Sequence, residues 1–383
     1  MTGAEAMTLL VSVLGAALFA VVVVLLLRLG DVLSSRVTAR VPRRAGDQTD
    51  RGSRDRGAVA GVPADSATGG RTEPEEDQRP LPAVIVNPTK FSDVTPLRTL
   101  VTKMCAELGW QEPLWLETTA EDPGIGQAKE ALGAGAHVVM ACGGDGTVRT
   151  VAEALAGTGV PLGLIPAGTG NLLARNLDMN VDDMGAATRV ALAGDDRAVD
   201  VGRITLDDGS GPGEEQVFLV MAGMGFDATI METAPEALKA KVGPVAYTVA
   251  GLRNLRGRQA RVRVAVDDRP EFQRRVRTLV VGNCGKLLGG LVLMPDAEID
   301  DGWLDAVAIA PQGITGWLAV AARVMTRQRK GHRRVEHWRA QAMTIACEQP
   351  EPAQLDGDPV GEVRAMRIRV DPGALLVRVP HRR

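Results

Sequence analysis

Two glycine-rich segments hold the residue types that could bind a phosphate group. Residues 143–147 read Gly-Gly-Asp-Gly-Thr, and residues 166–171 read Pro-Ala-Gly-Thr-Gly-Asn. Glycine lets the backbone approach a phosphate closely, and free amide groups at the start of a helix favour an anion. The carboxylate of Asp145 would not contact phosphate directly, so it is expected to hold a magnesium ion or to orient a hydroxyl group.

These loops differ from the common nucleotide-binding motifs. Neither contains the Gly-Lys-Ser/Thr of a Walker A loop or matches Gly-x-Gly-x-x-Gly, and the protein-kinase signatures are absent from the sequence. Each loop alone is compatible with an ordinary turn between a strand and a helix. Two such loops on successive strand–helix units meet at one edge of a parallel sheet, where ligands bind, so together they predict a ligand site.

The segments around the loops predict a parallel sheet covered by helices. Short apolar runs predict strands at residues 83–86, 114–117, 138–142 and 162–165. Helical patterns occupy the stretches between and after them, at residues 95–109, 126–133, 148–156 and 172–177. Because strands that alternate with helices are typical of the α/β class, residues 81–199 are predicted to form an α/β nucleotide-binding domain.

The pattern changes after about residue 199. Residues 261–266 alternate strictly between polar and apolar side chains, as an antiparallel strand does. Further strands are predicted at residues 278–282, 306–310, 344–346, 364–370 and 375–379. Helical signals are few here, so residues 200–383 are predicted to form a mostly antiparallel β-sandwich domain, whose last strand or tail could return to the first domain.

The first 80 residues differ from the rest of the chain. Residues 8–27 form an uncharged apolar run, which as a helix would span about 30 Å of hydrocarbon. A cleaved signal peptide is the alternative, but no Lys or Arg precedes Arg28. Basic residues follow the run, which predicts a single-pass protein of the inner membrane with a cytoplasmic catalytic domain. Residues 1–30 are thus the predicted transmembrane anchor, and residues 31–80 a disordered linker.

The composition excludes several classes of protein. The 383-residue chain has a net charge of −3 and only 3% aromatic residues, which argues against a nucleic-acid partner. Its four cysteines are scattered without a Cys-x-x-Cys pair, so neither a zinc ribbon nor a disulfide scaffold is expected.

Further motifs follow the glycine loops in a fixed order and carry a resemblance. They are Asn87-Pro88 before the loops and, after them, Gly223-Met224-Gly225-Phe226-Asp227-Ala228, Asn283, Gly289-Gly290, Pro295 with Ala297, residues 300–305, and Asp356-Gly357-Asp358. Together with the loops, these motifs resemble the diacylglycerol kinase catalytic-domain family, the bacterial soluble-type lipid kinases that are related to sphingosine kinases. The resemblance covers roughly residues 83–380.

The resemblance implies an ATP site and a catalytic base. Asp145 would organise water around a catalytic Mg²⁺ ion, Asp200 would join this network, and Asp358 would take the proton from a lipid hydroxyl. The residues around ATP would be Asn87, Thr89, Thr118 or Thr119, Gly143, Gly144, Asp145, Gly146, Thr147, Gly168, Thr169, Gly170 and Asn171.

The resemblance also implies a structural Mg²⁺ ion and, by analogy with relatives, a possible homodimer. Asp301 and the backbone carbonyls of Glu298 and Trp303 would bind this ion. Residues 314–334 form an amphipathic helical pattern with a basic end, which would either dock on anionic lipid or cover the β domain.

The sequence thus predicts a lipid kinase that transfers the γ-phosphoryl group of MgATP to diacylglycerol of the bilayer, giving phosphatidic acid. Three positions depart from the family pattern: Asp358 stands in place of glutamate, Leu172 in place of aspartate, and Lys90-Phe91 in place of Ser-Gly. A kinase for another lipid or for NAD, and a membrane-tethered nucleotide- or lipid-binding protein with little catalysis, are the alternatives.

Overall fold

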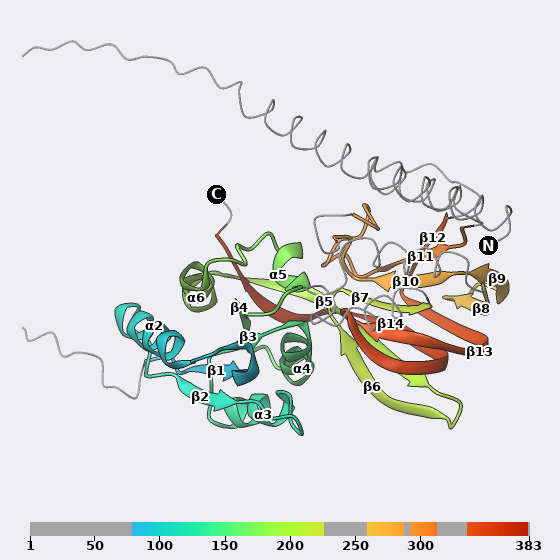
Figure 1. Cartoon of the computed structure of the whole chain (residues 1–383). Helices are drawn as coiled ribbons and strands as arrows, with labels where there is room; N and C mark the ends of the chain where they lie inside the picture. The colour runs from blue at the N-terminus through green and yellow to red at the C-terminus, as the bar shows by residue number, and fades with distance from the viewer. Residues whose placement is uncertain (1–78, 226–258, 287–291, 312–334, 382–383) are drawn as a thin grey trace, which may run out of the picture. The chain divides into compact units, whose positions relative to one another are not determined.

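A computed structural model of the protein describes residues 79–225, 259–286, 292–311 and 335–381 (Figure 1). These ranges contain both glycine loops and every residue predicted to bind ATP, to bind metal or to act in catalysis. Several predicted features lie outside the described residues: the apolar span 8–27, the linker up to residue 78, the motif residues 226–228 and 289–290, and the amphipathic segment 314–334.

Four parallel strands form the sheet that carries the glycine loops (Figure 1). In the order β2-β1-β3-β4, each strand pairs in parallel with its neighbour. All residues of β1, β3 and β4 are buried, which explains their uninterrupted apolar sequences. The bounds confirm the four predicted strands to within one residue at either end: β1 Pro82–Val86, β2 Leu114–Glu117, β3 Val138–Gly143 and β4 Leu162–Pro166.

Helices cover both faces of this sheet. Successive strand residues point to opposite faces, so Ala83 and Ile85 of β1 join a core with α3 and α4, whereas Val84 and Val86 join a core with α2 and α6. The helix bounds are η2 Pro88–Lys90, α2 Thr95–Glu107, α3 Ile125–Gly133, α4 Asp145–Leu155, α5 Leu172–Asn176 and α6 Met184–Ala193.

Two helices differ from the sequence expectation. Helix α4, predicted to start at residue 148, begins at Asp145, with Gly144 as its extended N-cap. The residues that suggest a loop therefore end β3 at Gly143, cap the helix at Gly144 and place Gly146 in its first turn. Helix α6 occupies a stretch for which the sequence predicts no element, because its alanine-rich sequence has little apolar periodicity. It nevertheless buries Ala191 and Leu192 against the sheet.

The structure confirms a β-rich C-terminal part. Its strands pair antiparallel in the order β12-β11-β10-β7-β13-β14, with β5, β6, β8 and β9 attached to β13 and β14 directly or through a neighbour. Their inward side chains form a separate core that includes Phe218, Leu279, Ile345 and Ile368. The bounds are β5 Asp195–Asp207, β6 Pro212–Phe218, β7 Met221–Gly225, β8 Ala260–Val266, β9 Phe272–Val276, β10 Thr278–Gly282, β11 Leu304–Ile309, β12 Val335–Ala340, β13 Ala342–Leu355 and β14 Asp358–Val379.

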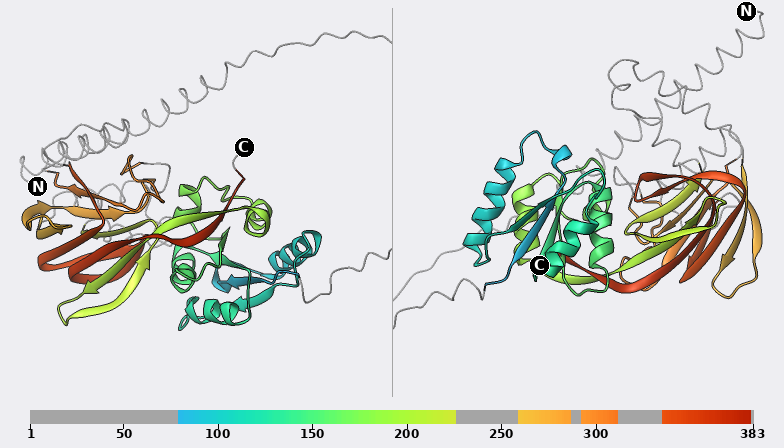
Figure 2. Two further views of the ribbon diagram at one scale, coloured as in Figure 1. Left: turned by 180° about the vertical axis from the view of Figure 1, so that it is seen from behind. Right: turned by 90° about the horizontal axis from the view of Figure 1, so that it is seen from below.

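Strand β14 is longer than the sequence predicts and pairs with both parts of the fold. The predicted strands 364–370 and 375–379 belong to this one strand, which pairs with β13 and β5 and has a register shift between Asp371 and Leu375. Near its end, Val377 pairs in parallel with Leu162 of β4. Figure 2 shows the red strand running from the β-rich part to the helix-covered sheet. The predicted domain boundaries at residues 30, 80 and 199 stay predictions.

The predicted membrane span requires a correction. Within residues 79–225, 259–286, 292–311 and 335–381, no helix is long and apolar enough to cross a membrane. The longest of these helices, α2, has 13 residues, whereas a span needs about 20. The span predicted at residues 8–27 lies outside these ranges, so no described helix supports the transmembrane helix, and the localisation as a single-pass inner-membrane protein with a cytoplasmic catalytic domain is withdrawn.

Candidate active site

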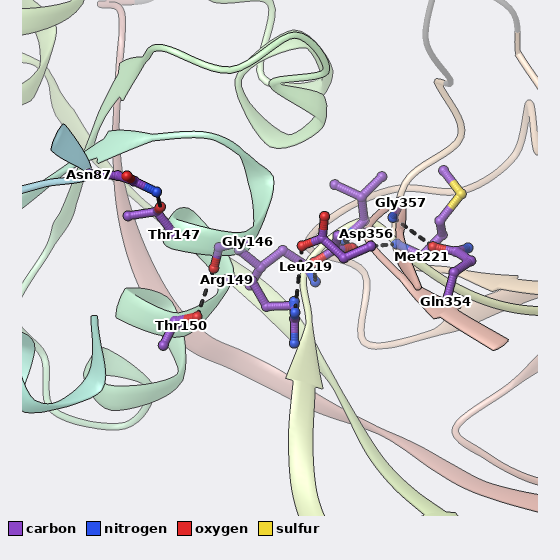
Figure 3. Close-up of polar contacts among 12 residues, drawn as sticks. Asn87, Gly146, Thr147, Arg149, Thr150, Leu219, Met221, Gln354, Asp356 and Gly357 are labelled. Atoms are coloured by element: carbon purple, nitrogen blue, oxygen red, sulfur yellow. Dashed lines mark hydrogen bonds and ion pairs between the residues drawn. The ribbon is translucent and has the colours of Figure 1, made fainter. Parts of the chain in front are cut away.

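Asn87 connects two of the predicted ATP-binding segments at the carboxyl ends of β1 and β3. Its backbone N–H donates to the carbonyl of Cys142 at 2.9 Å. Its side-chain Nδ2 donates to Oγ1 of Thr147 in the first glycine loop at 3.4 Å (Figure 3). Its Oδ1 accepts hydrogen bonds from the backbone N–H and the hydroxyl of Thr89, at 3.1 and 2.7 Å. The Asn87 amide thus fixes both segments at one edge of the sheet.

The two glycine loops touch through their backbones. The N–H of Ala167 donates to the carbonyl of Gly143 at 2.9 Å. A Cβ atom on Gly168 would lie only 2.6 Å from the Cα atom of Gly144, far closer than packed carbon atoms approach. Glycine is therefore required at position 168. Asn171 closes the second loop, since its Oδ1 accepts from the N–H of Gly168 at 3.0 Å and its Nδ2 donates to the carbonyl of Gly168 at 2.8 Å.

Asp145 joins the first loop to the second. Its Oδ1 accepts a hydrogen bond from the backbone N–H of Leu172 at 2.6 Å, and its Oδ2 lies against Gly170, where a Cβ atom would collide with it. Burial raises the pKa of the Asp145 carboxyl, the N–H groups of Leu172 and Asn171 lower it, and the charge of Asp358 raises it. Because the Leu172 contact uses the backbone, it does not depend on the side chain that departs from the family pattern.

Three threonines of the predicted ATP site differ in exposure. Thr118 follows β2, is buried, and donates its N–H to the carbonyl of Val86 at 2.9 Å. Thr119 is exposed, and its hydroxyl accepts from the N–H of Asp122 at 3.1 Å. Thr169, in the second loop, is also exposed. Thr119 and Thr169 are therefore better able to reach a ligand than Thr118 is.

Asp358, the predicted base, lies directly against the first glycine loop. A Cβ atom on Gly146 would lie 2.7 Å from Oδ2 of Asp358. The Asp358 side chain is 48% exposed, which leaves room for a substrate hydroxyl, and Nη2 of Arg149 lies 3.6 Å from its Oδ2. The aspartate therefore reaches the loop, although its side chain is one methylene shorter than the glutamate of the family pattern.

A tight hairpin presents Asp358 to the loop. Leu355, the last residue of β13, pairs with Asp358, and Asp356 and Gly357 form the two-residue connection. Both connecting residues have positive φ, +49° and +94°, as a type I′ turn requires. Asp356 is buried, and its carboxylate accepts backbone hydrogen bonds of 2.8–2.9 Å (Figure 3) from Leu219, Val220 and Met221. The hairpin is thus fixed to the chain that enters β7.

The Asp356 carboxyl is expected to make stability depend on pH. Burial raises the pKa of Asp356 to about 6, above the ordinary value of 3.8, although the three N–H donors lower it. A raised pKa means that the protonated carboxyl favours the folded state. This contribution is therefore complete below about pH 4 and is lost as the pH rises through about 6.

Urea unfolding of the native protein and of the Asp356→Asn variant checks this expectation. Between about pH 4 and pH 8, the native protein should lose free energy of unfolding relative to the variant, which has no carboxyl at this position. A difference between the two proteins that stays constant across this range would contradict the prediction.

The structure groups Asp200 with the predicted structural metal site. Its buried carboxylate accepts hydrogen bonds from the N–H groups of Gly302 and Gly373, at 2.6 and 2.8 Å. Within the described residues, no hydrogen bond or ion pair joins Asp200 to Asp145 or to Asp358. The predicted link between Asp200 and the catalytic network is therefore not seen as a direct contact.

The structural Mg²⁺ ion is predicted at one carboxylate, that of Asp301, and at two backbone carbonyls, and the structure gives this carboxylate a cationic partner. In the part of the chain that the structure describes, no group of three or more His, Cys, Asp or Glu side chains could hold a metal ion. The carboxylate of Asp301 instead pairs with the guanidinium of Arg339, which also lies over the ring of Trp303, 5.3 Å from its centroid. Burial raises the pKa of Asp301, and the Arg339 charge opposes that rise. Arg339 thus supplies a positive charge to the carboxylate to which the predicted ion would bind.

Removal of divalent cations is therefore expected to leave the stability of the protein unchanged. Thermal unfolding without nucleotide should give the same midpoint in excess EDTA and in Mg²⁺. The Arg339→Ala variant should unfold more easily by less than about 1 kcal/mol, because the Arg339 side chain is half exposed. A midpoint of the native protein that falls on adding EDTA would reveal a bound metal ion and contradict the prediction.

Two features of the site are missing from the sequence prediction. Asp-Gly between two strands is among the strongest short hairpin signals, so the turn at Asp356 and Gly357 could have been predicted. The sequence contains no comparable signal that would predict a role for Arg149. Its relation to Asp145 becomes visible only when α4 is known to begin there, because residues four apart share one face of a helix.

Comparison with known proteins identifies the parts of the chain. The sequence profile of the diacylglycerol kinase catalytic domain matches residues 83–204. The profile of the YegS C-terminal NAD kinase beta sandwich-like domain matches residues 220–379. A crystal structure of a diacylglycerol kinase from Bacillus anthracis superposes with a TM-score of 0.57 at 19% identity, over 79% of this chain and 97% of that chain. This similarity supports the fold.

Curated relatives extend the match to named enzymes. A protein of Pseudomonas aeruginosa named "Probable lipid kinase YegS-like" is 35% identical over 263 residues, which cover 66% of this chain and 80% of the relative. A diacylglycerol kinase of Mycobacterium tuberculosis is 35% identical over 176 residues, covering 46% of this chain and 55% of the relative. The chain therefore belongs to the diacylglycerol kinase catalytic-domain family and is a lipid kinase of the YegS-like type.

Proposed function

We propose that the protein transfers the γ-phosphoryl group of ATP to the hydroxyl group of a membrane lipid. Diacylglycerol is the acceptor we favour, and phosphatidic acid would be the product. The relative from Mycobacterium tuberculosis, which is named as a diacylglycerol kinase, supports this choice of acceptor. Membership of a kinase family supports a nucleotide as the phosphoryl donor.

One contact carries the proposal: the approach of Asp358 to the first glycine loop. Oδ2 of Asp358 lies 2.7 Å from the position of a Cβ atom on Gly146. Asp145, the neighbour of Gly146, is close enough to Asp358 for the two charges to interact. Phosphoryl transfer needs a bound nucleotide, neutralised charge and one group that orients or deprotonates the acceptor. A carboxylate beside a phosphate-type loop meets the last of these needs.

The proposed roles follow from these positions. The backbone amide groups at the start of α4 and in the second glycine loop would bind the phosphates of ATP. Asp145 would hold Mg²⁺, which when bound neutralises the phosphate charge. Asp358 would accept the proton of the lipid hydroxyl as that oxygen attacks the γ-phosphorus and the bond to the β-phosphate oxygen breaks. ADP and the phosphorylated lipid would leave.

The other predicted partners are part of the same proposal. The acceptor would be met at a lipid surface, because diacylglycerol does not dissolve in water as a monomer. Pairing of the chain with a second copy rests on the analogy with relatives and is tested by the mass of the protein in solution.

An acceptor panel tests the function. The full chain is incubated with labelled ATP, Mg²⁺ and mixed micelles that contain diacylglycerol, monoacylglycerol or a sphingoid base, with dissolved NAD as a separate acceptor. Labelled phosphatidic acid is the expected product, and micelles without acceptor are the control. Transfer only to another lipid would identify that lipid as the acceptor in place of diacylglycerol. Transfer to NAD alone would overturn the lipid kinase proposal. ATP binding without any labelled product would favour a binding protein with little catalysis.

A further inference from the structure

Arg149 approaches one of the two carboxylates that the proposed reaction needs and lies on the same helix as the other. It lies in the second turn of α4, four residues after Asp145, and it approaches the hairpin that carries Asp358 (Figure 3). Gly146, on the same helix, packs against the Asp358 carboxylate. One rigid helix therefore carries a carboxylate of the nucleotide loop, the glycine that contacts the base, and a cation directed at the base.

The distance between Arg149 and Asp358 suits positioning better than permanent pairing. Nη2 of Arg149 lies 3.6 Å from Oδ2 of Asp358, beyond the 2.7–3.2 Å or so of a hydrogen bond between nitrogen and oxygen. By contrast, Nε of Arg203 lies 2.6 Å from Oδ2 of Asp371 in the β-rich part. The Asp358 carboxylate is thus attracted to α4 while its lone pairs stay available to a hydroxyl group.

Burial strengthens this attraction. The Arg149 side chain is only 15% exposed, and its buried Nε has no hydrogen-bond partner among the residues that the structure describes. A charge that is withdrawn from water interacts more strongly with a neighbouring carboxylate. The Arg149 charge also reaches Asp356, where it opposes the rise in pKa that burial causes. Arg149 therefore attracts both carboxylates of the hairpin toward α4.

We infer that Arg149 is the positioning residue for Asp358. It holds the short aspartate side chain against Gly146, beside the first glycine loop. The phosphoryl group and the lipid hydroxyl would meet there. The inference rests on the proposed function. Arg149 should therefore influence kcat through Asp358 and leave the binding of ATP nearly unchanged.

A double-mutant cycle tests the inference on the full chain. The native protein, Arg149→Ala, Asp358→Asn and the double variant are compared by kcat for lipid phosphorylation and KM for ATP. Arg149→Ala should lower kcat by about 10- to 100-fold, less than the full contribution of a general base, and change KM by less than about twofold. Added to Asp358→Asn, it should cause little further loss, because the carboxylate through which it acts is gone.

Two further variants separate positioning from folding. Arg149→Lys keeps the positive charge and should give a kcat between those of the native protein and Arg149→Ala. Arg203→Ala removes the ion pairs of another partly buried arginine with Asp371 and Glu215 in the β-rich part and should leave kcat unchanged. Thermal unfolding of every variant identifies any that are misfolded.

The outcomes distinguish the inference from the function on which it rests. Losses that multiply in the double variant, or a raised KM for ATP with an unchanged kcat, would overturn the role of Arg149 while the protein remains a kinase. Equal losses in Arg149→Lys and Arg149→Ala would do the same. If the native protein phosphorylates no lipid, the proposed function is overturned first, and the inference with it.

Discussion

Replacing Asp358 with asparagine is expected to lower the turnover number of lipid phosphorylation by about 10²- to 10⁴-fold, the usual contribution of a general base. Asparagine has nearly the same shape as aspartate, so it can still pack against Gly146, but its amide cannot accept the proton of the lipid hydroxyl. The affinity for ATP should be almost unchanged, because the contacts between the two glycine loops do not involve Asp358. Initial rates with diacylglycerol in mixed micelles and direct binding of ATP measure the two quantities.

A matched control makes the Asp358 result specific. Asp371 also lies on β14 and pairs with an arginine, Arg203, but it lies in the β-rich part and not in the hairpin. Asp371→Asn should retain the native turnover number. If Asp358→Asn loses less than about tenfold, the carboxylate is not the base, and the reaction relies on positioning and charge neutralisation alone.

Replacing Gly168 with alanine is expected to weaken ATP binding about 5- to 150-fold, which corresponds to the 1–3 kcal/mol or so of an overpacked contact. The new methyl group would lie 2.6 Å from the Cα atom of Gly144. That neighbour is backbone, so it cannot rotate away, and the two loops must separate. The amide groups that are expected to hold the phosphates would then no longer converge.

Binding of a non-hydrolysable ATP analogue, measured by calorimetry, checks the Gly168→Ala prediction. Gly133→Ala is the matched control, since a Cβ atom at Gly133 would have no neighbour within 4 Å. It should bind the analogue as the native protein does. Unchanged binding by Gly168→Ala would mean that the crossing of the two loops does not determine the phosphate site.

The strands of the sheet could be predicted from the sequence because burial on both faces leaves a simple pattern. Residues of β1 and β3 are apolar without interruption, and turn residues bound them, so their limits are correct to within one residue. The start of α4 could not be predicted in this way. Helix propensity counts glycine as unfavourable, whereas at Gly146 the close approach of the Asp358 carboxylate favours it.

The candidate site could be predicted only in part, because some of its contacts join residues that are far apart in the sequence. Local motifs point to Asp145 and to Asp358, which the structure brings together. Local sequence gives no means of predicting that Arg149 would approach Asp358, because Arg149 lies on α4 and Asp358 begins β14, far apart in the chain. The same holds for Arg339, whose contact with Asp301 depends on the pairing of β12 with β11.

The pairing of β14 with β4 has a consequence for how the protein is made. Val377 neighbours Leu162, although more than half of the chain separates them in sequence. The ribosome releases the chain from its amino end. The edge of β4, the outer strand of the nucleotide-binding sheet, therefore stays unpaired until β14 has been synthesised. Such long-range closure is slow and leaves an unpaired strand edge exposed for a time. We therefore expect both halves to complete folding together after synthesis, with β4 the segment that chaperones protect in the meantime.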